Sequence, residues 1–351
     1  MADTSSPRVL VTGATGFIAR HVITQLLDAG FHVRGTARAL RSEQQLRTDL
    51  QSGVVGPSAL DRFTLVEADL MRDEGWDSAV EGCAFVHHIA SPVPMSIPKD
   101  PEDVIRPARD GTLRVLRAAS AAGVRRFVYT SSVSAVLSGV RRDHTFTETD
   151  WSDPDAKGVG PYERSKTLAE RAAWEFSRSA QAASMEFAVV NPGVVLGPMI
   201  GNDASTSLEL VRKLLAREVP GCPNLCVAIV DVRDVAAVHL AAMTSSDAVG
   251  RRFLAAGPSC SFKDVALVLH DHSEPLGIKV TTRAIPKWLV RLAALFDKTT
   301  ALALPDIDNP YSIDASAAEA LLGRPFKPWP EVVTATADTL MKYGVVEVKS
   351  P

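Results

Sequence analysis

What this sequence has little of already narrows the class of protein. Its 351 residues include only four cysteines, too few and too scattered for a disulfide framework. The pair Cys222 and Cys226 has no second ligand pair nearby, so we expect buried free thiols and no metal site. A net charge of -3 provides no electrostatic footprint for nucleic acid or an anionic membrane. The expected partner is a small molecule.

Long apolar runs and targeting segments are also missing. The chain starts without a basic stretch and apolar h-region, so no secretory signal is expected and the cytosol is the default location. The longest late apolar stretch, Trp288 to Leu304, is interrupted by three charged residues, which favours a core or lid helix over a membrane span. No low-complexity linker divides the chain. We therefore expect one enzyme-sized unit, as a monomer or homodimer.

Short β-branched runs alternate with longer amphipathic stretches through the first half of the chain. Strands are predicted at 8–11, 31–37, 63–67, 84–88, 127–131 and 187–190, with helices at 16–29, 101–122 and 162–182 among them. This order predicts an α/β fold of the Rossmann type, with a doubly wound parallel sheet. Its ligand crevice should lie beyond the carboxyl ends of the strands.

After Gly193 the alternation loosens. A strand at 227–230, a helix at 232–244 and a strand at 252–255 resume it, and proline-punctuated segments follow. We therefore expect a main nucleotide-binding domain of residues 1–192 and 227–257. Residues 193–226 and 258–351 should form a smaller, discontinuous C-terminal lobe that covers the crevice and binds the substrate.

The segment VTGATGFIA places Gly13 and Gly16 between the first strand and the first helix. Without side chains there, backbone N–H groups and the helix N-terminus can approach a pyrophosphate. The strand FHVRGTA ends in Arg38, and no acidic residue precedes Glu43. A carboxylate at this point would accept the ribose hydroxyls of NAD, whereas a cation suits the 2′-phosphate of NADP. The sequence therefore favours NADP(H), with Asp69 placed to contact adenine.

Tyr162 and Lys166 stand four residues apart at the start of a predicted helix, so both side chains lie on one face. An adjacent ammonium favours the phenolate and is expected to lower the phenol pKa, which would make the pair an acid and base. Ser132 ends the strand FVYTSS at the same edge and can hydrogen-bond a carbonyl oxygen. Ser131 and Ser134 are less favoured alternatives for that role.

These motifs occur in a familiar order: TGATGFI, Arg38, Ala90-Ser91-Pro92, TSS, YERSK and NPGVVLGP. The chain resembles the extended short-chain dehydrogenases/reductases. Within them it is similar to the branch of dihydroflavonol reductases and fungal and yeast carbonyl reductases. The resemblance implies a catalytic set of Ser132, Tyr162 and Lys166, the last two also touching the cofactor. The other cofactor-binding residues that it implies are Gly13, Thr15, Gly16, Phe17, Ile18, Arg38, Asp69, Leu70, Ala90, Ser91, Pro192, Gly193, Val194 and Val195.

The implied reaction is reversible reduction of an aldehyde or ketone by NADPH, with the proton coming from Tyr162. It fits a ketoreductase step in specialised metabolism. Val93, Met95 and Val133 are expected to contact an uncharged or partly apolar substrate. Two alternatives stay open. One is an NAD-dependent nucleotide-sugar epimerase or dehydratase, which Arg38 disfavours; the other is a non-catalytic NADP-sensing protein.

Overall fold

A parallel sheet of seven strands forms the centre of the computed structural model, which describes residues 6–54, 56–91, 98, 100–202, 206–296 and 298–346. The strands follow the order β11-β7-β5-β4-β1-β2-β3 and pair in parallel throughout. They are β1 (Arg8–Val11), β2 (His32–Ala37), β3 (Phe63–Glu67), β4 (Cys83–His88), β5 (Arg126–Thr130), β7 (Glu186–Pro192) and β11 (Arg252–Ala255). The predicted Rossmann-type sheet is confirmed.

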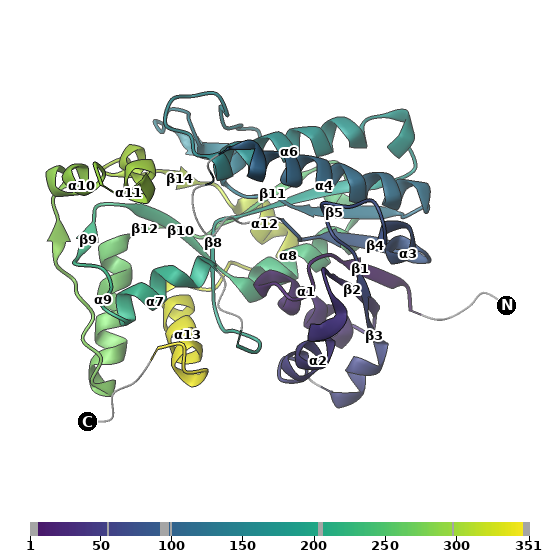
Figure 1. Cartoon of the computed structure of the whole chain (residues 1–351), viewed down its shortest axis with the longest axis horizontal. Helices are drawn as coiled ribbons and strands as arrows, with labels where there is room; N and C mark the ends of the chain where they lie inside the picture. The colour runs from purple at the N-terminus through teal and green to yellow at the C-terminus, as the bar shows by residue number, and fades with distance from the viewer. Residues whose placement is uncertain are drawn as a thin grey trace.

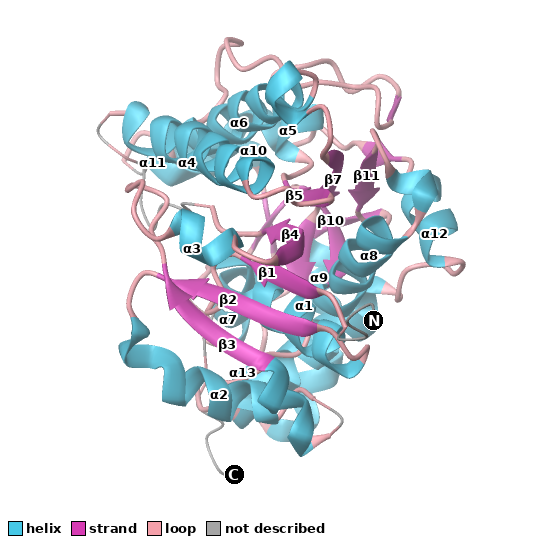
Figure 2. Cartoon of the chain, turned by 90° about the vertical axis from the view of Figure 1, so that its right-hand side faces the viewer, coloured by secondary structure: helices cyan, strands magenta, loops and turns pink. Residues whose placement is uncertain are grey.

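Helices cover both faces of this sheet, as Figures 1 and 2 show. One face carries α4 (Glu102–Ala121) and α6 (Pro161–Ser177), with the short α3 (Trp76–Val80) and α5 (Ser134–Leu137). The other carries α1 (Phe17–Asp28), α2 (Glu43–Gln51), α8 (Val232–Thr244) and α12 (Ser316–Leu322). Parallel strands are buried on both faces for this reason, and all five residues of β5 are buried. The run RFVYT is therefore buried along its whole length and does not alternate between buried and exposed residues.

A second group of elements lies beside the large sheet, at the left in Figure 1. Its sheet contains β8 (Val194–Leu196), β10 (Cys226–Asp231) and β12 (Ser259–Ser261). Its helices are α7 (Glu209–Leu215), α9 (Phe262–Ser273), α10 (Lys287–Ala293), α11 (Lys298–Ala303) and α13 (Trp329–Lys342). Two short parallel pairs complete it: β6 (Thr145–Phe146) with β14 (Ser312–Ile313), and β9 (Cys222–Pro223) with β13 (Ala284–Ile285).

The segment 227–257, which we assigned to the main domain, contributes to both sheets. Its first strand, β10, pairs with β8 and β12, whereas β11 forms an edge of the large sheet. Between them, α8 packs on α1 and on strands of the large sheet. The chain thus crosses from the small sheet to the large sheet within a single strand–helix–strand unit. The domain boundaries that we expected stay a prediction.

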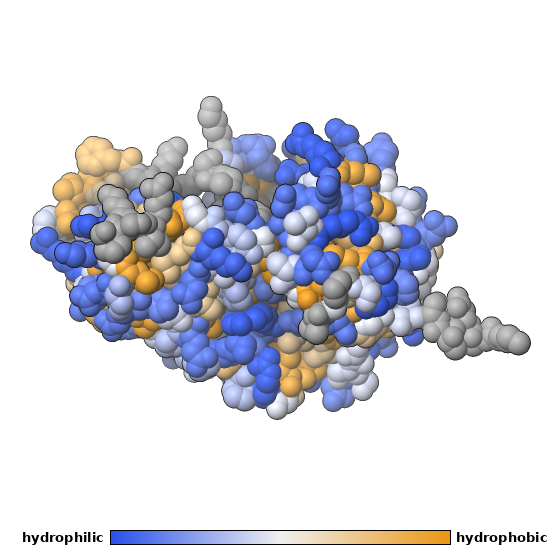
Figure 3. All heavy atoms as spheres, turned by 90° about the horizontal axis from the view of Figure 1, so that it is seen from below, coloured by the Kyte–Doolittle hydropathy of each residue, from blue (hydrophilic) through white to orange (hydrophobic). Residues whose placement is uncertain are grey.

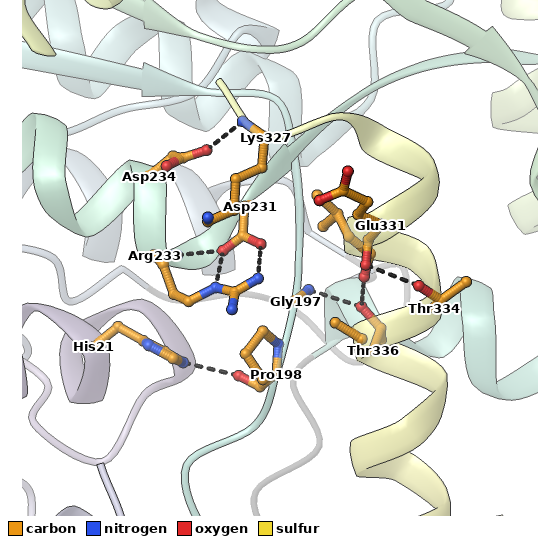
Figure 4. Close-up of polar contacts among 12 residues, drawn as sticks. His21, Gly197, Pro198, Asp231, Arg233, Asp234, Lys327, Glu331, Thr334 and Thr336 are labelled. Atoms are coloured by element: carbon orange, nitrogen blue, oxygen red, sulfur yellow. Dashed lines mark hydrogen bonds and ion pairs between the residues drawn. The ribbon is translucent and has the colours of Figure 1, made fainter. Parts of the chain in front are cut away.

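Polar contacts join the two groups of elements below α8 (Figure 4). The buried carboxylate of Asp234 accepts from Arg324 Nη2 at 2.6 Å and from the backbone N–H of Lys327 at 2.7 Å. The backbone N–H of Gly197 donates to Thr336 Oγ1 at 2.7 Å, and His21 bonds the Pro198 carbonyl at 2.8 Å. Asp234 on α8 thus binds the segment that leads into α13, and His21 on α1 binds the segment after β8, while Thr336 ties that segment to α13 within the second group.

Of the two expectations for the segment Trp288 to Leu304, a core helix or a lid helix, the structure excludes a single buried helix. The segment forms two short helices, and the exposed fraction of Trp288 is 66%, of Leu295 75% and of Phe296 87%. Apolar atoms gather at the left end of the molecule in Figure 3, where α10 lies in Figure 1. Within the described ranges, no helix is both long and apolar enough to cross a bilayer.

We expect Asp234→Asn to lower the free energy of unfolding by about 2 kcal/mol, since it weakens two hydrogen bonds to a fully buried carboxylate. Urea denaturation followed by circular dichroism measures the change. Glu331→Gln, on the exposed start of α13, is the control and should stay within about 0.5 kcal/mol. Equal stability of the two variants would contradict this role of Asp234.

Candidate active site

Two cavities open where the strands of the large sheet end. The first has a volume of about 760 Å³ and is lined by residues that follow β1, β2, β3, β4, β5 and β7. The second has a volume of about 630 Å³ and lies between the end of β5, the start of α6 and the smaller sheet. Ser132, Tyr162, Gly193 and Ser207 line both cavities. Two of the three predicted catalytic residues therefore stand where the cavities meet.

The structure brings most of the predicted cofactor residues together around the first cavity. Lys166 lines it with Tyr162 and Ser132. The other predicted residues in its wall are Gly13, Thr15, Gly16, Phe17, Ile18, Arg38, Asp69, Leu70, Ala90, Ser91, Pro192, Gly193 and Val195. Val194 and Val133 line the second cavity instead. Val93 and Met95 fall outside the described residues.

The turn between β1 and α1 leaves room for a phosphate group. Gly13 has a φ of +68°, and a Cβ there would lie 3.1 Å from the Cβ of Ala90. Gly16 caps α1 without a side-chain hydrogen bond, and the first turn contains no acidic residue. Unpaired N–H groups and the positive end of the helix dipole therefore face the first cavity. This cradle fits the pyrophosphate of a dinucleotide.

Arg38 differs from the other arginines nearby. Arg34 donates to the carbonyls of Ser78, Ala79 and Glu81, whereas Arg38 has no hydrogen bond or ion pair to any residue that the structure describes. It is exposed at the end of β2 and lines the first cavity. Asp69 also lines it, while its Oδ1 accepts from the N–H of Met71 at 2.9 Å. A free cation at this edge is suited to an anionic ligand group.

The start of α6 positions the reacting side chains. Gly160 and Pro161 begin the helix, as the fixed φ of proline favours its first turn. Lys166 is 4% exposed, and its Nζ lies 5.8 Å from the centre of the Tyr162 ring. Tyr162 is hydrogen-bonded to Ser132, which the N–H of Ser134 holds at 3.1 Å. The three predicted catalytic residues therefore form one group.

The pKa values of this group differ from our expectation. Burial raises the pKa of Tyr162 to about 12, and the hydrogen bond from Ser132 only partly opposes it. Burial also lowers the pKa of Lys166 to about 8, against the attraction of Glu170. We expected the Lys166 ammonium to make the phenol more acidic than usual, whereas desolvation and the nearby Glu163 carboxylate raise its pKa. Tyr162 is therefore a proton donor at neutral pH.

The second cavity has mostly apolar walls, and its charged lining residues are Arg142, Lys157, Glu163 and Asp306. Apolar side chains in its wall are Val133, Leu137, Val140, Val159, Val194, Leu210, Leu225 and Val227. Arg142, whose side chain is 8% exposed, pairs with Asp306, donates to the Asn309 carbonyl at 2.9 Å and lies over the Tyr311 ring. Local patterns do not indicate this pair, because Arg142 and Asp306 are far apart in the chain.

Histidine and cysteine side chains, the residue types most often found as metal ligands, have structural roles in this chain. His87, His88 and His239 are fully buried, and burial lowers the pKa of His88 and of His239 to about 3. His88 bonds Thr12 and Thr112, whereas His239 bonds Thr130. Cys83, Cys222 and Cys260 are buried free thiols, and Cys226 is partly exposed. Among the described residues, no group of histidine, cysteine and acidic side chains is arranged to hold a metal ion.

Comparisons with known proteins agree with this geometry. A cinnamoyl-CoA reductase of Petunia hybrida is 37% identical over 255 residues, which cover 72% of this chain and 73% of that protein. A dihydroflavonol 4-reductase of Arabidopsis thaliana is 39% identical over 57% of this chain and 52% of its own length. The crystal structure of yeast methylglyoxal/isovaleraldehyde reductase Gre2 with NADPH superposes with a TM-score of 0.78 at 27% identity, covering 97% of this chain and all of that one.

Residues 9–256 match the NAD dependent epimerase/dehydratase family, and this range contains every cofactor and catalytic residue that the motifs predicted. The sequence therefore gave the correct family. With its sheet, its glycine turn and its Ser132, Tyr162 and Lys166 group in place, the chain belongs to the NAD dependent epimerase/dehydratase family, that is, to the extended short-chain dehydrogenases/reductases.

Proposed function

We propose that this enzyme reduces an aldehyde or ketone to the alcohol with NADPH. The observation that carries the proposal is the position of Tyr162 and Ser132 at the junction of the two cavities. One cavity fits a dinucleotide and the other, mostly apolar, fits an organic substrate. Two relatives, a cinnamoyl-CoA reductase and a dihydroflavonol 4-reductase, are reductases, which supports reduction rather than epimerisation.

Each residue of the group has a distinct task. Ser132 orients the substrate carbonyl oxygen by a hydrogen bond, while Tyr162, protonated at neutral pH, donates a proton to it. Lys166 places a positive charge beside the phenol and stabilises the tyrosinate that forms when the proton leaves. Bound NADPH supplies the hydride. The reverse oxidation uses the same groups.

The cofactor preference rests on Arg38. We infer that its guanidinium pairs with the 2′-phosphate of NADP(H), with Gly13, Gly16 and the start of α1 at the pyrophosphate. A relative at 27% identity was crystallised with NADPH, which supports this choice. NAD offers Arg38 no phosphate at that position, so it should bind more weakly.

The substrate class follows from the second cavity. Its aliphatic walls favour an uncharged or partly apolar carbonyl compound, since a desolvated charge there would need its own partner. The deciding experiment is NADPH consumption with a panel of aldehydes, aryl ketones, diketones and polyketide-like ketones, with NADH in parallel. Conversion of a sugar nucleotide at constant cofactor would instead establish the epimerase alternative, and NADPH binding without any turnover would favour a sensing protein.

Tyr162→Phe should reduce kcat by about a hundredfold or more while NADPH affinity stays within about twofold, because only the transferable proton is lost. Fluorescence titration measures binding and NADPH oxidation measures turnover. Tyr343→Phe is the control, since that hydroxyl bonds the N–H of Gly201 at 3.3 Å, away from both cavities. Undiminished turnover by Tyr162→Phe would remove this residue from the mechanism.

Arg38→Ser should weaken NADPH binding by about tenfold to a hundredfold and leave NADH binding nearly unchanged, as one charge-assisted phosphate contact is lost. Arg41→Ser removes the same charge from an exposed residue that does not line the cavity. Its NADPH affinity should equal that of the natural chain. A parallel loss for both cofactors in Arg38→Ser would show that Arg38 does not read the phosphate.

The rate of reduction should fall as pH rises through about 8, where Lys166 loses its proton. The sign follows from the lowered pKa: the ammonium is present below that pH and absent above it, while Tyr162 stays protonated throughout. We would measure kcat from about pH 6 to about pH 10 at saturating substrate. A rate that stays constant up to the upper limit would contradict the role of the ammonium.

A further inference from the structure

A buried carboxylate lies one turn beyond the catalytic pair on α6. Glu170 is 0% exposed, and its position four residues after Lys166 puts it on the same face of the helix. Its Oε1 accepts from Arg252 Nε at 2.6 Å and from Trp174 Nε1 at 3.3 Å. Its Oε2 accepts from Ser131 Oγ at 2.5 Å and from Asn191 Nδ2 at 2.7 Å. The proposed reaction assigns this group no task.

Two of these donors belong to the strand ends that form the site. Ser131 immediately precedes Ser132 at the end of β5. Asn191, near the end of β7, also donates to the carbonyl oxygen of Ser132 at 3.1 Å. The residues that follow it, Pro192 and Gly193, line the first cavity. One carboxylate therefore connects α6 to both strands that carry Ser132 and the cavity wall.

We propose that Glu170 is a positioning residue, which holds Ser132 in place through Ser131 and Asn191 and keeps the neighbouring Lys166 in its charged form. This inference rests on the proposed function for its kinetic consequence only. The charge on Lys166 and the bonding of Glu170 belong to the protein without substrate or cofactor, so they are testable separately.

The hydrogen bonds of Glu170 come from donors that face both of its carboxyl oxygens. Asn191 uses its amide N–H groups on Glu170 and on the Ser132 carbonyl, and its own Oδ1 is buried with no partner among the described residues. An unpaired buried carbonyl costs about 1 to 3 kcal/mol, so this orientation persists only because two acceptors face the amide nitrogen. If residue 170 presented an N–H instead of an oxygen, the Asn191 amide would rotate by half a turn, and its hydrogen bond to the Ser132 carbonyl would be lost.

Arg252 forms an ion pair with Glu170 inside the protein and so compensates for the loss of hydration of the carboxylate. Its guanidinium also donates to the carbonyls of Glu148 and Asp150 at 2.9 and 2.7 Å, and it lies 4.0 Å from the centre of the Trp151 ring. Arg252 is thus held by backbone groups that do not depend on Glu170. A change at Glu170 that keeps an oxygen facing Arg252 should preserve this anchor.

The ionisable groups around Lys166 include Tyr129 of β5, which stacks on His88 and whose pKa burial raises. Tyr162 and Glu170 lie on α6, and His88 at the end of β4 is kept neutral because burial lowers its pKa to about 3. Glu170 is the group that raises the pKa of Lys166, whereas burial lowers it. Removing the carboxylate charge therefore shifts Lys166 toward its neutral form at a lower pH.

The test compares Glu170→Gln with Asp234→Asn. Glutamine keeps the size and one carbonyl for Arg252, but it presents an N–H toward Ser131 and Asn191. Asp234 is an equally buried carboxylate with an arginine partner, remote from both cavities, so its variant controls for lost stability. Competitive acetylation of the cofactor-free proteins, read by mass spectrometry over a range of pH, reports the titration of Lys166.

We expect the acetylation midpoint of Lys166 to move to lower pH in Glu170→Gln and to stay in place in Asp234→Asn. In reduction assays, kcat of Glu170→Gln should fall by about tenfold to a hundredfold, with its alkaline limb displaced the same way. An unchanged midpoint, or turnover equal to that of Asp234→Asn at equal stability, would overturn the proposal. If neither the natural chain nor any variant reduces a carbonyl, the proposed function fails while the acetylation result still decides this one.

Ser131→Ala covers the case in which Glu170→Gln does not fold. It removes one contact of Glu170 to β5 but leaves the ion pair with Arg252 intact. We expect kcat to fall by about tenfold with little change in the acetylation midpoint, because the carboxylate charge remains. If Ser131→Ala has the same kcat as the natural chain, the hydrogen bond between Ser131 and Glu170 does not position Ser132.

Discussion

The charge on Lys166 is the constraint around which the rest of the site is arranged. An ammonium that is 4% exposed has lost most of its hydration, which disfavours the charged form. Two features oppose this loss. The carboxylate of Glu170 lies on the same helix face, and the cavity keeps a path to solvent open beside the side chain. The fully buried Glu170 in turn needs Arg252, so a line of alternating charges runs from the cavity into the core.

This arrangement depends on the point in the sheet where the strand order reverses, between β1 and β4. The chain builds β1, β2 and β3 toward one edge and then returns to place β4, β5 and β7 on the other side of β1. The chain continues from β1 to a helix on one face and from β4 to a helix on the other face, and the crevice lies beyond the strand ends at this point. Gly13 and Ala90 approach each other there, and α6 brings Tyr162 to the same edge from outside the sheet. Binding and chemistry are therefore adjacent because of topology.

Much of the fold and of the candidate site could be predicted from local sequence patterns. Strands 8–11, 63–67 and 252–255 and helix 232–244 have the predicted bounds, since hydrophobic periodicity and turn residues act within a few positions. The catalytic group and the glycine turn followed from short motifs. The pKa of Tyr162 and the pair of Arg142 with Asp306 did not, because burial and contacts between distant segments decide them. The exposure of Trp288, Leu295 and Phe296 could not be predicted either, because composition does not show which apolar residues pack against another element.

The path of the chain through Gly193 has a mechanical consequence. This single residue separates β7 of the large sheet from β8 of the small one, and its N–H donates to the Ala255 carbonyl at 2.9 Å. A Cβ there would lie 2.3 Å from the Ala228 oxygen, so the two sheets touch at a point without side-chain padding. A side chain at this position would push the two sheets apart at a residue that lines both cavities. The spacing between cofactor and substrate therefore depends on the side chain that glycine lacks.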